Sequence, residues 1–232
     1  MSSHLIKLSD YSLAAVGSGS GIQGFNFALA PGDVCAIDSQ YADDAHIFLR
    51  ALAGMTRPLK GNYFFKGKPR DLRRYEEMLD CKKQIGYVAR DTALISNLTV
   101  RQNLLLQRYY HENRISIDLA ADVLALCKTF GIHEKLDRRP AGLNAMETQA
   151  AIIIREISKK PSVLLLGQPE DFIGHAKFDL MTQIFNQLIG ERLPIVFLSF
   201  DRRLARRFAN RKVIISDGAL TTVAFKASAG GE

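Results

Sequence analysis

The order of hydrophobic and polar positions predicts strands that alternate with helices. Residues 5–8 and 25–29 alternate apolar with polar side chains, which indicates strands with one buried face. Residues 60–68 predict a further strand and turn. Compact apolar runs, typical of strands buried on both faces, occur at residues 34–37, 85–88, 163–166, 195–198 and 213–215.

Helical periodicity separates these strands. An apolar stripe predicts a helix over about 45–54 with Gly54 as its C-cap, and Thr99 with Gln102 predicts a capping box that opens another helix. Strands that alternate with helices imply a parallel sheet with helices on its faces, and the strand-poor stretch 91–158 predicts a helical lobe. Further helices are predicted at 117–130, 145–159 and about 178–190.

A glycine-rich patch at 17–21 creates a formal GxGxxG pattern with Gly19, Gly21 and Gly24. A dinucleotide-binding loop needs a helix after this pattern, whereas here an alternating strand follows and ends at Pro31. We therefore interpret the patch as a flexible hairpin turn.

Composition narrows the class of protein. The 232 residues are 47% hydrophobic and 24% charged, as in an ordinary globular domain. No apolar run reaches the ~18 residues of a membrane-spanning helix, and the N-terminus lacks the layout of a signal peptide. The three cysteines lack metal-ligand spacing, which favours a reducing, cytoplasmic location without a metal cluster. The net charge is +7, but acidic residues interrupt the basic clusters and no nucleic-acid-binding motif is present, so no nucleic-acid partner is expected.

Six segments follow one another in a characteristic order at residues 27–34, 50–58, 85–88, 137–143, 163–169 and 212–220. Their order and spacing resemble those of ABC-transporter ATPase subunits from about residue 5 to 225. The segment 93–100, with Asn103 and Tyr109 to His111, is most similar to the MCE-type (Mla-like) lipid transport ATPases. The resemblance implies one α/β domain over 1–232 with a P-loop NTPase-like ABC ATPase fold. Its three-layer core, with an antiparallel β portion, would cover about 1–90 and 159–226, and its helical lobe about 91–158.

The stretch that corresponds to the family's phosphate loop, residues 39–46, contains no glycine. Ser39 and Asp44 stand where the loop has glycines, Ala45 where it has a lysine, and His46 where it has a magnesium-binding hydroxyl. Asp43 and Asp44 also place negative charge at a predicted helix N-terminus, where a phosphate would bind. We therefore expect that this chain supplies its own anion at this place. His46 beside these carboxylates lacks a third well-spaced ligand, so no metal site is expected.

The other functional positions of the family differ too. Gly167 and Gln168 stand where the Walker B strand has an aspartate for magnesium and a glutamate for water, and an amide cannot accept a proton. The resemblance assigns the remaining positions as follows: Asn144, Ala145, Met146 and Glu147 to the signature motif, Arg90 to the glutamine loop, Phe200 to the switch histidine and Gly174 to the aspartate after Walker B.

These replacements predict a catalytically inactive subunit, a pseudo-ATPase without a nucleotide cofactor, with a structural or regulatory role in a membrane transport complex for lipids of the MCE type. The expected partners are an integral-membrane permease and a second ATPase-like subunit or a second copy, at the inner face of the membrane. One alternative is a divergent ABC ATPase that binds ATP and Mg²⁺ and hydrolyses ATP weakly. Another is a binding module for a non-nucleotide ligand, such as a cation drawn by Asp38, Asp43 and Asp44.

Overall fold

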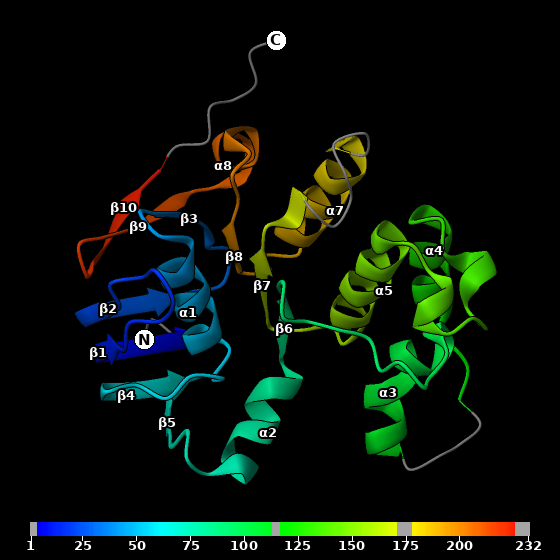
Figure 1. Ribbon diagram of the computed structural model, residues 1–232, viewed down its shortest axis with the longest axis horizontal. Coiled ribbons are helices and arrows are strands. Elements are labelled where there is room, and N and C mark those ends of the chain that lie inside the picture. Colours follow the sequence, from blue (N-terminus) through cyan, green and yellow to red (C-terminus); the bar gives the residue numbers. More distant parts are fainter. Residues whose placement is uncertain (1–3, 113–116, 171–177, 226–232) are drawn as a thin grey trace.

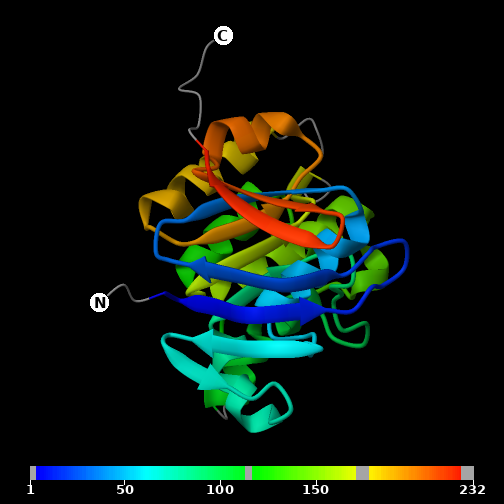
Figure 2. The same ribbon diagram turned by 90° about the vertical axis from the view of Figure 1, so that its left-hand side faces the viewer.

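The computed structural model describes residues 4–112, 117–170 and 178–225, which form two β-sheets and the helices that pack on them (Figure 1). The smaller sheet is antiparallel, with the strand order β2-β1-β4-β5 (Figure 2). Its members are β1 (Ile6–Leu13), β2 (Ile22–Leu29), β4 (Lys60–Phe65) and β5 (Lys68–Arg70). The alternating burial along β2 agrees with the one-faced strand that its sequence predicts.

The larger sheet has the strand order β10-β9-β3-β8-β7-β6 and is parallel except at β10. Every residue of β6, β7 and β8 is buried, as the compact apolar runs predict. Its strands are β3 (Val34–Ser39), β6 (Ile85–Val88), β7 (Val163–Gly167), β8 (Ile195–Leu198), β9 (Arg211–Ser216) and β10 (Ala219–Ala224).

Helix α1 (Ala42–Leu52) lies between the two sheets. Phe48 of α1 is fully buried and its ring meets those of Phe25 and Phe27 at centroid distances of 5.9 and 5.1 Å. The C-cap is Ala53, one residue before the predicted Gly54, which follows in the left-handed region with φ 65°. The antiparallel sheet, α1 and one face of the parallel sheet thus share a single apolar core.

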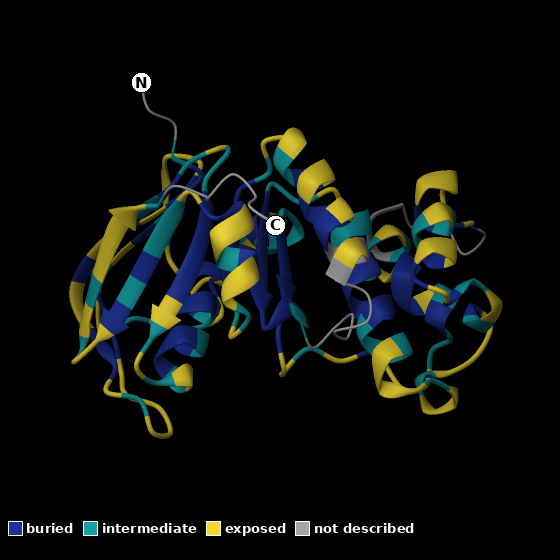
Figure 3. Cartoon of the chain, turned by 90° about the horizontal axis from the view of Figure 1, so that it is seen from above, coloured by how far each residue is buried: buried dark blue, intermediate teal, exposed yellow. Residues whose placement is uncertain are grey.

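The other face of the parallel sheet packs against helices (Figure 3). Helices α5 (Ala145–Ser158), α7 (Phe178–Gly190) and α8 (Arg202–Phe208) contribute to this second core. Helices α3 (Val100–Glu112) and α4 (Ala121–Thr129) pack on α5 at the far end of the molecule in Figure 1. The division of the domain into a core and a helical lobe near residues 91 and 158 stays a prediction.

Several elements differ from the sequence prediction. Helix α4 begins at Ala121 instead of residue 117, and Ile117 and Leu119 are buried in the segment before the helix. Helices α2 (Tyr75–Lys83) and α8 were not predicted, because each is short and rich in charged residues. The capping box before α3 is confirmed: Gln102 N–H donates to Thr99 Oγ1 (3.2 Å), and Thr99 N–H donates to Gln102 Oε1 (2.8 Å). No described helix is long and apolar enough to cross a membrane.

Candidate functional site

The candidate site lies at the carboxyl ends of the parallel strands, where α1 begins. In open parallel α/β sheets ligands bind at this edge. Strand β3 ends at Ser39 and leads into α1, which carries Asp44, Ala45 and His46, while β7 ends at Gly167. A Cβ built on Gly167 would lie 3.5 Å from His46 Cε1 and 3.1 Å from Ala89 Cβ. The structure thus brings together three segments that the sequence assigned to one site: residues 39–46, the end of β7, and the turn after β6.

Two adjacent carboxylates of α1 face the loop between β1 and β2. Asp44 is 3% exposed and accepts hydrogen bonds from Ser20 N–H (3.0 Å) and Gly21 N–H (2.9 Å). Asp43 accepts from both the N–H (2.8 Å) and the hydroxyl (2.9 Å) of Ser18. The backbone N–H groups of a turn form a concave site for anions, and here the anions come from the same chain. We call this arrangement, residues 17–21 with Asp43 and Asp44, the carboxylate latch.

The glycines of this latch allow the 17–21 loop to approach the carboxylates of Asp43 and Asp44 closely. A Cβ on Gly19 would lie 2.3 Å from Asp44 Oδ1, and a Cβ on Gly17 would lie 2.4 Å from Asp43 Oδ2. The sequence predicted a flexible hairpin turn for these residues. Residues 17–21 do connect β1 to β2, but four hydrogen bonds hold the connection against α1. No local signal in the sequence predicts this pairing, because its partners are 23 to 25 residues apart.

Electrostatics around the latch favour the carboxylate form of Asp43 and the neutral form of His46. Hydrogen bonds from the N–H and the hydroxyl of Ser18 lower the pKa of Asp43 below its ordinary value of 3.8. Burial lowers the pKa of His46 below 6.5, and the positive charge of Arg90 lowers it further against the opposing effects of Asp43 and Asp91. His46 is therefore a neutral imidazole at neutral pH.

Among the remaining predicted positions, Gln168, Asn144 and Glu147 have local structural roles. Gln168 is buried in the left-handed region (φ 59°), and its N–H donates to Leu198 O (2.7 Å). Asn144 caps α5 in a capping box: Glu147 N–H donates to Asn144 Oδ1, and Asn144 N–H donates to Glu147 Oε2, both at 2.9 Å. Phe200 is 64% exposed, and Ala145 and Met146 occupy the exposed first turn of α5. Gly174 lies outside the described residues.

The residues around α1 do not fit a magnesium nucleotide in this conformation. Asp43 and Asp44 place two carboxylates at the helix start, and Ala45 is fully buried, so no cation stands at the position assigned to the lysine. The arrangement also disfavours a cation held jointly by Asp38, Asp43 and Asp44. Asp43 and Asp44 face the 17–21 loop, whereas Asp38 pairs with Lys212 (2.6 Å). In the described part of the chain, no group of three His, Cys, Asp or Glu side chains could hold a metal ion.

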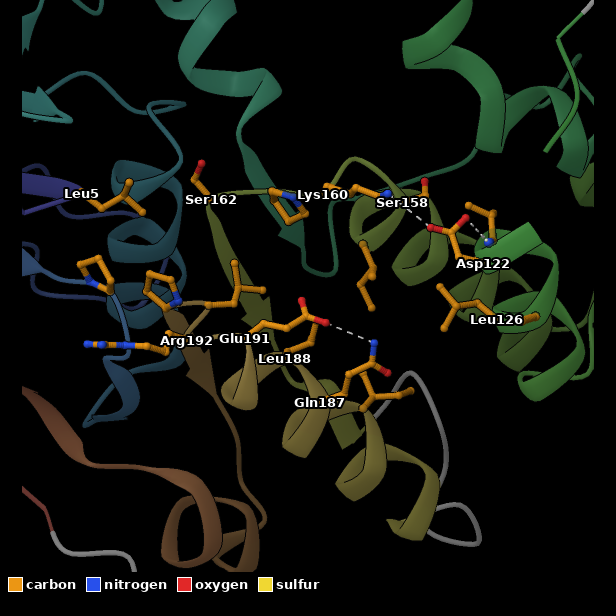
Figure 4. Close-up of a pocket in the computed structure, with 18 of the residues that line it drawn as sticks. Leu5, Asp122, Leu126, Ser158, Lys160, Ser162, Gln187, Leu188, Glu191 and Arg192 are labelled. Carbon is orange, nitrogen blue, oxygen red and sulfur yellow. Dashed lines mark hydrogen bonds and ion pairs between the residues drawn. The ribbon is translucent and has the colours of Figure 1, made fainter. Parts of the chain in front are cut away.

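A cavity of about 960 Å³ lies away from this edge (Figure 4). It lies near the amino ends of β7 and β8, between α4, α5 and α7. The ion pair of Lys160 with Asp122 (3.5 Å) and the hydrogen bond of Gln187 with Glu191 (3.4 Å) lie at its wall. It contains none of the residues assigned to the nucleotide site.

Residues 47–170 match the family of ABC transporters. This chain belongs to the ABC transporter family. The chain is 24% identical to the cell division ATP-binding protein FtsE of Escherichia coli over 216 residues, covering 93% of this chain and 97% of FtsE. It is 30% identical to the molybdenum import ATP-binding protein ModC of Brucella melitensis over 196 residues, covering 83% of this chain and 53% of ModC.

Solved structures agree on the fold. The dimeric ATP-binding cassette MJ0796 bound to ADP and Pi superposes with a TM-score of 0.79 at 17% identity, covering 94% of this chain and 98% of the cassette. A second dimeric structure of MJ0796, described as a bacterial ABC transporter cassette, gives the same TM-score at 18% identity. The predicted ABC ATPase fold is therefore confirmed.

The prediction that this family member is not an enzyme is wrong. Its relatives FtsE and ModC are named ATP-binding proteins, and together with the family match they point to an ATP-hydrolysing enzyme. The prediction weighed missing side chains at single positions, whereas the comparisons weigh the whole chain. The specific similarity to lipid-transport ATPases and the motif correspondences stay predictions, since the relatives named here belong to cell division and molybdenum import.

Proposed function

We propose that this chain is a divergent ABC ATPase that works as the peripheral subunit of a membrane transport complex. The strongest support is the similarity to FtsE, which extends over nearly the full length of both chains. Dimeric relatives with the same fold support pairing with a second copy or a second ATPase subunit. The side chains at the start of α1 do not fit a nucleotide in this conformation, so this proposal assigns no step of hydrolysis to them.

A groove between α2, α3, α4 and α5 supports the proposal of a membrane-protein partner. The groove has a volume of about 820 Å³, and Leu104, Leu105 and Leu119 form part of its buried apolar lining. Basic side chains surround this lining: Lys82, Lys83, Arg108, Arg155, Lys159 and Lys160. The acidic residues in the wall, Asp122 and Glu156, are already paired with Lys160 and with Arg155 and Lys159.

The occupant that fits this groove is a short amphipathic helix of the permease with acidic residues beside its apolar face. The apolar lining would receive the apolar face of that helix, and the basic rim would contact its carboxylates. At the finer level, we propose a lipid-transport system of the MCE type, supported by the resemblance of residues 93–100. This subunit would then lie at the inner face of the membrane through its permease.

ATP hydrolysis tests the enzymatic part of the proposal. The purified chain, and the chain with its co-expressed permease, should release phosphate from ATP in a magnesium-dependent way. Activity should fall in Gln168→Ala, because Gln168 is buried at the carboxyl end of β7 beside the candidate site. Magnesium-dependent hydrolysis that is absent both alone and with the permease would contradict the proposed function.

Co-purification with the permease tests the groove. Lys82→Glu with Lys83→Glu should lower recovery of the complex by about tenfold or more, because charge reversal at a complementary interface is costly. Lys7→Glu with Lys68→Glu, on the antiparallel sheet, is the matched control. Equal loss in both pairs, or no loss in either, would argue against the groove as the docking site.

A further inference from the structure

A cavity of about 440 Å³ lies beside the carboxyl ends of β3 and β8, on the side of α8. Its lining includes Asp38, Phe200, Arg202, Arg206, Lys212 and Phe225. We propose that this cavity binds a phosphate ester that carries a planar ring, the chemical class to which nucleotides belong. The site is separate from the carboxylate latch, because none of the latch residues lines it.

The topology favours ligand binding here. After β3 the chain continues through α1 toward β6, which lies to one side of β3 in the sheet. After β8 the chain continues through α8 to β9, which lies on the other side of β3. The crevice outside the carboxyl ends of two such strands is where open α/β sheets bind ligands. Ile37 and Asp38 from the end of β3, and Ser199 and Phe200 after β8, line this cavity.

The charge of the lining favours an anion. Arg202 and Arg206 are four residues apart on α8, so they lie on the same face of the helix. Neither has an ion-pair or hydrogen-bond partner among the residues that the structure describes. Lys212 adds a third cation to the lining. It is paired at 2.6 Å with Asp38, which is the one acidic residue of the lining. The guanidinium group matches the geometry of a phosphate bidentately.

The aromatic residues of the lining favour a planar ring on the ligand. Phe200 is 64% exposed, which leaves a ring face open to solvent next to the two arginines. Its backbone N–H donates to Glu170 Oε1 (2.7 Å), so the turn that presents the ring is held in place. Phe225 is half-buried in the same lining. An aromatic side chain can stack on any nucleic-acid base or similar planar ring, because each of these rings presents a π-face.

The two sides of β3 therefore differ in what they can attract. On the α1 side, Asp43 and Asp44 already occupy the N–H groups of the 17–21 loop and repel a phosphate. On the α8 side, three cations face one carboxylate. A phosphorylated ligand that approaches this edge of the sheet is directed to the α8 side.

Equilibrium calorimetry with three probes tests the site: 4-nitrophenyl phosphate, adenosine 5′-monophosphate and pyrophosphate. Arg202→Ala with Arg206→Ala should weaken binding of all three by about tenfold or more, because both charged donors are lost. Arg138→Ala with Arg139→Ala, two exposed arginines before α5, is the matched control and should bind like the native chain. Phe200→Ala should weaken binding of the two ring-bearing probes but leave pyrophosphate unchanged.

The outcomes separate the sources of the ligand. Tighter binding of adenosine 5′-monophosphate than of 4-nitrophenyl phosphate supports the site and identifies a nucleotide, whereas equal binding supports it and identifies a simpler aryl phosphate. Absence of binding by every probe at millimolar concentration, in a chain shown to be folded by circular dichroism, overturns the proposal. Binding that survives in Arg202→Ala with Arg206→Ala but changes in Asp43→Asn with Asp44→Asn also overturns it, because the ligand then binds on the α1 side. These results do not depend on ATP hydrolysis, so the proposal can fail while the proposed function stands.

Discussion

Asp44 is a buried carboxylate whose burial is offset by N–H donors from another part of the chain. It is 3% exposed, and both of its oxygens accept backbone hydrogen bonds from the 17–21 loop. A buried charge without such partners would be strongly unfavourable. At the scale of the residue, Asp44 thus joins the start of α1 to the connection between β1 and β2.

Asp44→Ala should lower the free energy of unfolding by about 2–3 kcal/mol, because two charge-assisted hydrogen bonds are lost and the buried Gly21 N–H is left without its acceptor. Urea unfolding followed by circular dichroism measures this change. Asp80→Ala removes an exposed carboxylate on α2 and should change stability by less than about 0.5 kcal/mol. Similar effects of the two substitutions would show that the latch contributes little.

The lowered pKa of His46 predicts how stability changes with pH. The folded pKa lies below the ordinary value of 6.5, so the unfolded chain binds more protons between the two values. The contribution of His46 is therefore present above pH 6.5 and is lost as the pH falls through the folded pKa. Asp43, whose pKa is also lowered, adds a loss with the same sign at more acidic pH.

His46→Gln should flatten the fall in stability between pH 7 and about pH 5, since an amide does not titrate there. Urea midpoints measured across this interval give the slope. His133→Gln, in the connection between α4 and α5, is the control. A native slope that is unchanged in His46→Gln would contradict the prediction.

At the scale of the element, capping boxes mark where α3 and α5 begin. Asn144 and Glu147 satisfy each other's backbone N–H groups, so the residues that the family resemblance assigned to a signature motif also define the start of α5. Asn144→Ala should lower stability by about 1 kcal/mol, because an N-cap side chain is lost. Thermal and urea unfolding measure it. Met146→Ala, exposed in the same turn, should change stability by less than half as much.

The carboxylate latch requires a residue without a Cβ at position 19. Gly19→Ala should be destabilising, because its Cβ would lie 2.3 Å from Asp44 Oδ1. Gly190→Ala is the matched control, since no heavy atom lies within 4 Å of a Cβ there. In a double-mutant cycle, Asp44→Ala should relieve most of the cost of Gly19→Ala, because the clash is with the removed carboxylate. Simple additivity of the two changes would argue against this contact.

At the scale of the whole molecule, α1 couples the two sheets through one shared core. Phe48 is fully buried between Phe25 and Phe27 of β2 and the parallel sheet. Phe48→Ala should cost about 3–5 kcal/mol and shift unfolding of the entire domain, because the cavity opens where both sheets meet. Phe64→Ala, on the partly exposed face of β4, should cost much less. Unfolding of the antiparallel sheet alone would contradict a shared core.

Much of the fold was predictable because short-range patterns carry it. Compact apolar runs predicted β3, β6, β7, β8 and β9, and the Thr99–Gln102 box predicted the start of α3. Helix α8 was missed because its pattern RRLARRF is short and highly charged. Of the candidate site, the sequence predicted which residues stand at the start of α1, while their substitution for a phosphate stays a prediction. It predicted neither the partner of the two aspartates nor the enzymatic class, which the whole-length comparisons corrected.

By itself the sequence determined the buried strands of the parallel sheet, the start of α3 and the residues at the carboxyl ends of the strands, because periodicity and capping act over a few residues. The tertiary structure decided which distant groups meet. It placed the amides of the 17–21 loop on Asp43 and Asp44, and it placed Arg202 and Arg206 beside the exposed ring of Phe200. Such contacts depend on how the elements pack across the chain, and no local pattern of side chains specifies them.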